Sequence, residues 1–155
     1  RELTVDVLHA VNGLSPADLT ATEQMRFRSD GVTYSVPAPE IMLKAKIANA
    51  ATLDQNNRQD VRHVNIMVAC CRHFLMDAYE AVVAKKLAER DAIERYMSTL
   101  RVIKESVARE AEARHNLNLS RAIPAREKLA ELPRLPRLTA FYDHQIRPHG
   151  PRISI

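Results

Sequence analysis

The sequence predicts an α+β fold: a small N-terminal strand and β-hairpin portion packed on helices, then a long helical region and a Pro/Arg-rich tail. The length of 155 residues suits one domain with a helical extension. Short alternating runs rich in apolar and β-branched residues lie before Pro37. Between Pro39 and Pro124 the chain has neither proline nor glycine, and good helix formers dominate it.

The first expected element is a strand. Residues 3–9 form a short apolar and β-branched run around Asp6, and this composition is typical of a strand. Ser15 followed by Pro16 is typical of a helix N-cap and the first residue of that helix. We therefore expect a strand and then a short helix or turn.

A β-hairpin is expected next, at residues 25–36. Its two halves alternate in polarity on either side of Asp30-Gly31, a dipeptide that suits a two-residue hairpin turn. Pro39 and an acidic neighbour then fit the first turn of a helix, which we expect to run to about Thr52. Its predicted apolar face is Ile41, Leu43, Ile47, Ala48 and Ala51.

A polar cluster at residues 53–57 predicts a turn, and another helix is expected to begin near Gln59 and Asp60. Apolar residues of this helix recur at spacings of three and four, which is typical of an inward-facing stripe. The stripe comprises Val61, Val64, Met67, Val68, Cys71, Leu75 and Met76.

Apolar positions continue from Asp77 to about Leu119. One helix of this length would exceed the usual range, so we expect breaks near Asp77 and near residues 96–99. A short helix at residues 125–131 and then an extended tail are expected to follow. The predicted regions are residues 1–76, 77–120 and 121–155.

Composition excludes several classes of protein. With 46% hydrophobic and 27% charged residues, the chain is neither collagen-like nor disordered throughout. It has no run of about 18 apolar residues, so we expect no membrane-spanning helix. No signal peptide is visible, and the adjacent Cys70 and Cys71 are expected to stay reduced, so we predict a cytoplasmic protein. The chain starts at Arg1 rather than at Met, which suggests a fragment or a processed form.

Positive charge is concentrated in the tail. Residues 1–59 carry 6 basic and 7 acidic side chains, residues 60–119 carry 10 and 9, and residues 120–155 carry 7 and 3. The whole excess of +4 therefore lies in the last part, where arginines alternate with prolines. Such a tail fits either a solvated strap along the body or contacts with nucleic-acid phosphates.

Three segments carry the strongest functional signal. They are TVDVL at residues 4–8, VPAPE at residues 36–40 leading to KAKIA at residues 44–48, and RQDVR at residues 58–62. In this order they resemble the second half of a nucleotidyltransferase-like domain of the polymerase-β superfamily. The nearest resemblance is to the abortive-infection nucleotidyltransferase toxins.

The resemblance implies a set of site residues. Asp6 would be a catalytic carboxylate and the ligand of Mg²⁺, Lys46 the catalytic helix lysine, and Asp60 the acid that opens the last motif. Lys44 and Arg58 are candidates for contacts with the nucleotide. In nucleotidyl transfer, carboxylates hold metal ions against the triphosphate, and a lysine offsets the developing charge.

The chain departs from the family pattern at both ends of the resemblance. The family's opening glycine-serine and D-x-D motif would precede Asp6, before which only five residues stand here. Gln59 replaces the usual lysine, and His63 replaces the usual second acid. We therefore expect a partial or degenerate nucleotidyltransferase. When completed by a D-x-D motif, it would transfer a nucleotide from a nucleoside triphosphate to an RNA or protein acceptor.

Other interpretations remain open. Asp6 also fits a strand-edge acid, Lys44 and Lys46 fit solvated helix lysines, and Asp60 fits the favoured acid at a helix N-terminus. The alternative function is a non-catalytic helical module, in which residues 77–119 pair with an antitoxin-like partner or with a second copy. A third interpretation is a nucleic-acid binder that uses the basic tail.

Overall fold

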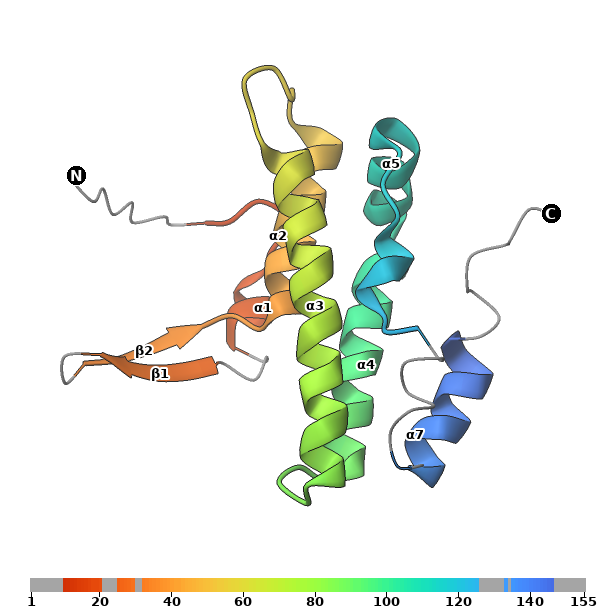
Figure 1. Ribbon diagram of the computed structural model, residues 1–155. Helices are drawn as coiled ribbons and strands as arrows, with labels where there is room; N and C mark the ends of the chain where they lie inside the picture. Colours follow the sequence, from red (N-terminus) through yellow and green to blue (C-terminus); the bar gives the residue numbers. More distant parts are fainter. Residues whose placement is uncertain (1–9, 21–24, 30–31, 126–132, 134, 147–155) are drawn as a thin grey trace.

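A computed structural model describes residues 10–20, 25–29, 32–125, 133 and 135–146 (Figure 1). In chain order the elements are α1 (Pro16–Thr20), β1 (Met25–Ser29), β2 (Val32–Val36), α2 (Pro39–Thr52), α3 (Asp60–Val83), α4 (Glu89–Lys104), α5 (Ser106–His115), η1 (Leu119–Ala122), α7 (Pro136–Phe141) and η2 (Tyr142–Ile146). η1 is a short 3-10 helix and η2 is a single π-helical turn.

Helices build the core. α3, with 24 residues, is the longest described element and packs against α2 and α4, while α5 packs against α2. One buried cluster joins α2, α5 and η1 to the N-terminal half of α3. A second cluster joins the C-terminal half of α3 to α4, α7 and η2. Figure 1 shows α3 running the length of the helical body, so this helix contributes to both clusters.

The predicted hairpin is confirmed, but the α+β fold class is wrong. β1 and β2 pair antiparallel, with Met25 opposite Val36 and Ser29 opposite Val32, the register expected of a hairpin with a two-residue connection. However, the two strands form a ribbon that projects from the helices (Figure 1). Where burial is described, both core clusters consist of helical residues and of Ile123 after η1. The described chain is therefore an all-α body with a hairpin attached.

The expected strand at residues 3–9 lies outside the described residues, whereas the helix expected at Ser15-Pro16 is confirmed as α1. Its N-terminus is capped reciprocally. The amide of Asp18 donates to Ser15 Oγ at 3.2 Å, and the amide of Ser15 donates to Asp18 Oδ2 at 2.7 Å. These two bonds satisfy amides that a short helix would otherwise leave unpaired.

α2 begins and ends where the sequence predicts. Pro39 occupies its first turn, and every residue of the predicted apolar face is buried. Ala45 and Ala50 are buried as well, so α2 is covered on more sides than an amphipathic surface helix would be. The segment before α1 also lies close to α2: Gly13 has φ +77, and a Cβ there would come within 2.2 Å of the Ala48 Cβ.

The predicted break near Asp77 is wrong, because α3 continues to Val83. The Asp77 side chain is exposed, so its charge stays solvated and the helix can continue past it. The predicted boundary at residues 76/77 therefore falls inside α3. The chain turns at residues 84–88 instead. There Lys85 adopts a left-handed φ of 57°.

The predicted break at residues 96–99 is also wrong, since α4 runs through them to Lys104. Glu105 separates α4 from α5 with an extended backbone, φ −59° and ψ 152°. α5 ends at Asn116, whose left-handed conformation is a common helix C-cap. The C-terminal ends of α4 and α5 therefore both lack the glycine or proline on which a sequence-based prediction depends.

The tail is not extended throughout. α7 and η2 occupy it, and Leu138, Tyr142 and Ile146 are buried in the second cluster. Glu89 Oε1 accepts a hydrogen bond from the Leu138 amide at 2.7 Å, which links the start of α4 to α7. Apart from its first residue, the helix expected at residues 125–131 lies outside the described part of the chain.

Candidate functional site

The structure brings Arg58 and Asp60 together at the start of α3, and the charge of Lys46 from α2 acts on Asp60. Asp60 is the first residue of α3, and its side chain is only 5% exposed. Arg58 Nε donates to Asp60 Oδ2 at 2.6 Å, and Asn49 Nδ2 donates to Asp60 Oδ1 at 3.3 Å. A buried carboxylate is thus held on both oxygens, once from the loop and once from α2.

The pKa of Asp60 reflects both its burial and the cations around it. Burial raises the pKa of Asp60, but the hydrogen bonds from Arg58 and Asn49 and the charges of Arg58 and Lys46 outweigh it. The pKa of Asp60 is therefore lowered overall, and the carboxylate stays ionised. Lys46 is close enough for its charge to contribute to this effect.

Two asparagines that the sequence analysis did not single out complete this polar cluster. Asn12 Nδ2 donates to Asn49 Oδ1 at 3.0 Å and to Thr52 Oγ1 at 3.1 Å. Asn49 follows Lys46 by one helical turn, so their spacing alone could have placed them on one face. Nothing local in the sequence indicates Asn12, because its partner lies 37 residues away.

Lys44 lies elsewhere. Its ammonium is 3.0 Å from Asp18 Oδ1 and 3.7 Å from Glu105 Oε1, so it joins α1 to the junction between α4 and α5. Burial alone would lower the pKa of Lys44. The hydrogen bond to Asp18 and the charge of Glu105 outweigh burial, so the pKa of Lys44 is raised overall. Lys44 therefore contacts different residues from Asp60, and its predicted contact with a nucleotide stays a prediction.

The predicted magnesium ligand, Asp6, lies outside the described residues. Within the described ranges, no three His, Cys, Asp or Glu side chains gather in a way that could hold a metal ion. We therefore derive no step through a metal from the described residues.

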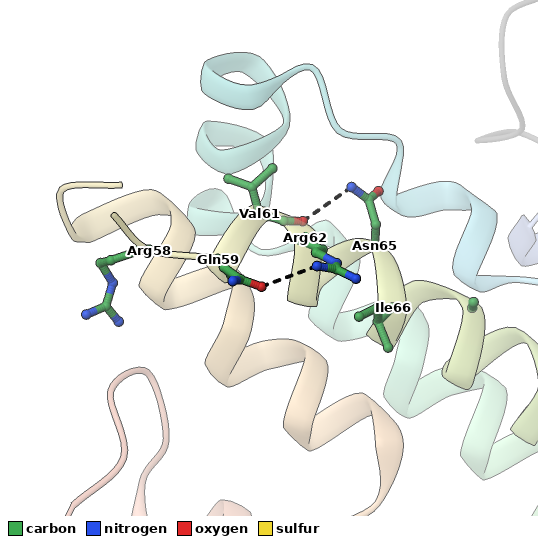
Figure 2. A pocket seen from close by; sticks show the side chains of 7 residues that line it. Arg58, Gln59, Val61, Arg62, Asn65 and Ile66 are labelled. Atoms are coloured by element: carbon green, nitrogen blue, oxygen red, sulfur yellow. Dashed lines mark hydrogen bonds between the residues drawn. The ribbon is translucent and has the colours of Figure 1, made fainter. Parts of the chain in front are cut away.

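A shallow groove of about 700 Å³ adjoins this cluster on the outer face of α3 (Figure 2). Arg58 and Arg62 line one end of it, and Ile66 and Ala69 line the other. Arg62 Nη1 lies 3.5 Å from Gln59 Oε1, at the long limit of a hydrogen bond. The groove therefore combines positive charge with an apolar floor.

The apolar faces of residues 77–119, on which the helical-module alternative was based, are covered within the chain. Ala92, Tyr96 and Leu100 of α4 are buried against α3 and the tail helix, while Ala108 and Ala111 of α5 are buried in the first cluster. These faces are therefore already occupied. Among the described helices, none combines the length and hydrophobicity that crossing a bilayer requires.

Comparison with known proteins adds no relative. No protein-family model, no curated protein sequence and no solved structure matches the chain. The proposals below therefore rest on the residues and contacts of this chain and on the motifs quoted above.

Proposed function

We propose that this chain supplies the cation-bearing half of a nucleotide site in a nucleotidyltransferase-like protein, with Lys46 and Arg58 facing the phosphates. The observation that carries the proposal is the buried Asp60 carboxylate, which holds the Arg58 guanidinium and lies near enough to Lys46 to be affected by its charge. Because the contact uses Arg58 Nε, the terminal guanidinium nitrogens stay available to an anionic ligand. The Arg58 side chain is 43% exposed, so phosphate can reach it.

Asp60 has a positioning role in this proposal. Its carboxylate holds the Arg58 guanidinium, and Asn49 holds the carboxylate in turn. A fixed arginine binds phosphate better than a mobile one, since less side-chain freedom is lost on binding. The order of hairpin, proline-containing link and helix also agrees with the resemblance described above.

The remaining parts of the proposal depend on residues that the structure does not describe. Asp6 would hold Mg²⁺, and six residues of chain keep it within roughly 20 Å of Asn12. Asn12 contacts the same network as Asp60, so chain connectivity allows Asp6 to approach the cluster. The acceptor would be RNA or a protein, and the missing D-x-D carboxylates would come from another segment.

Isothermal titration calorimetry with ATP and the other nucleoside triphosphates, with and without Mg²⁺, tests the proposal. We expect binding that Lys46→Ala weakens at least about tenfold, because one phosphate contact is lost. Asp6→Asn should remove the Mg²⁺ dependence. Lys44→Ala is the matched control on the same helix, and its affinity should stay unchanged. Absence of binding at millimolar nucleotide by a folded chain would overturn the proposal.

A further inference from the structure

The outer face of α3 carries a continuous stripe of side chains that no described segment covers. The stripe, at helical spacing, is Arg62, Ile66, Ala69, Cys70, His73 and Asp77. All of these residues are exposed except Ala69, which is half-buried, and Ile66 is 48% exposed. In Figure 1, α3 lies along the near side of the molecule, with α2 and α4 packed on its inner side.

Opposite charges stand at opposite ends of this stripe. Arg62 lies near the N-terminus of α3, and Asp77 lies near its C-terminus. Among the described residues neither forms an ion pair within the chain, although Arg62 reaches Gln59. Both charges are thus available to a partner surface.

The stripe is self-complementary when it is reversed. The midpoint of the stripe lies between Ala69 and Cys70. Arg62 and Asp77 lie at equal distances in sequence on either side of this midpoint, and so do Ile66 and His73. If two copies of α3 cross antiparallel at that midpoint, each Arg62 meets the other copy's Asp77. The small side chains at the midpoint allow the helices to approach closely. A parallel pair would instead place like charges together.

We propose that the outer face of α3 binds a second copy of this chain in an antiparallel, two-fold symmetric pair. The pair would bury Ile66 and the floor of the adjoining groove, and would form two equivalent Arg62–Asp77 ion pairs. Cys70 would lie beside the symmetry axis, whereas the neighbouring Cys71 is buried in the protomer. This inference does not rest on the proposed nucleotide site, although Arg58 lines one end of the same groove.

Sedimentation equilibrium of the whole chain tests the proposal. We expect a mass near twice the 17.5 kDa of one chain at tens of micromolar protein. Arg62→Asp or Asp77→Arg alone should raise the dissociation constant at least about tenfold, because each places like charges opposite one another. The double variant Arg62→Asp/Asp77→Arg should restore the dimer, because the swapped charges attract again.

Arg109→Glu, a charge reversal on an exposed residue of α5, is the matched control and should leave the dimer intact. A short bismaleimide should link Cys70 to Cys70 in the wild-type dimer, and Cys70→Ser should abolish that link. A monomeric mass up to about 100 μM, or a dimer that both single reversals leave unchanged, would overturn the proposal. Nucleotide binding, measured separately on the single variants, keeps the two proposals distinguishable.

Discussion

At the residue scale, the environment of Asp60 links the stability of the fold to pH. Its pKa is lowered in the folded chain because hydrogen bonds and nearby cations outweigh the effect of burial. A carboxylate of this kind stabilises the fold fully above its unfolded pKa, near 4. That stabilisation is lost as the pH falls through the lower, folded pKa, because protonation then accompanies the loss of the Arg58 contact.

Asp60→Asn should therefore destabilise the chain at pH 7 by about 1–3 kcal/mol, and by less at pH 3, because the stabilisation declines once the pH is below the unfolded pKa. Urea unfolding followed by circular dichroism across this pH range measures both values. Asp54→Asn is the control, since Asp54 is exposed and contacts only its own loop. Equal destabilisation by Asp60→Asn at both pH values would contradict the ionised, paired carboxylate described here.

How far this cluster can be predicted from sequence depends on the range of each contact. Arg58 and Asp60 lie two residues apart, and both were predicted as site residues from one short motif. Asn12 and Asn49 were missed, because their contact exists only after the segment before α1 has packed on α2. Lys44 and Lys46 were both predicted as site residues, but helical geometry turns residues two apart toward different partners.

At the element scale, the position of α7 depends on a contact from a distant helix. Glu89 Oε1 accepts the hydrogen bond of the Leu138 amide, one of the amides that the first turn of α7 leaves unpaired. Glu89→Ala should free this amide and loosen α7, while α4 stays folded. We expect hydrogen exchange of the Leu138 amide to accelerate about five- to thirtyfold, which corresponds to about 1–2 kcal/mol.

Glu94→Ala provides the comparison for that measurement. Glu94 belongs to the same helix, its side chain is 68% exposed, and among the described residues its ion pair is with Arg90 alone. Its removal should leave the exchange of α7 amides unchanged. If Glu89→Ala left them unchanged as well, the hydrogen bond would not stabilise α7, and burial of Leu138 would be its main anchor.

The predicted and observed elements differ for identifiable physical reasons. The hairpin, α1, α2 and the start of α3 each carry a local signal, such as a turn dipeptide, a cap or a proline, and all were predicted. The end of α4 has none: Glu105 is extended because α5 packs back on α2, which is a tertiary effect. α7 was missed because its prolines and arginines outweighed the helical spacing of Leu138 and Tyr142.

At the scale of the whole molecule, the two buried clusters are coupled through shared helices. α3 contributes Val64 and Val68 to the first cluster and Leu75 and Tyr79 to the second. Loss of α3 would therefore expose both clusters at once. This arrangement favours a single cooperative unfolding transition over separate melting on either side of the boundary predicted at residues 76/77.

Val64→Ala tests this coupling, because Val64 is fully buried in the first cluster. We expect a loss of roughly 1–3 kcal/mol in the free energy of unfolding. Tyr79, Tyr96 and Tyr142 lie in the second cluster, so in a Tyr34→Phe background tyrosine fluorescence reports that cluster. Labelling of the buried Cys71 thiol, in chains that carry Cys70→Ser, reports the first.

If the clusters unfold together, Val64→Ala should lower the urea midpoint of both signals by the same amount. The tyrosine signal should shift even though the substitution lies in the first cluster and the tyrosines lie in the second. A shift of the Cys71 signal alone would mean that α3 can fray from its N-terminal end while α4 and α7 keep its C-terminal half folded. That outcome would separate the surroundings of Asp60 from the second cluster in stability. The candidate site would then open without global unfolding.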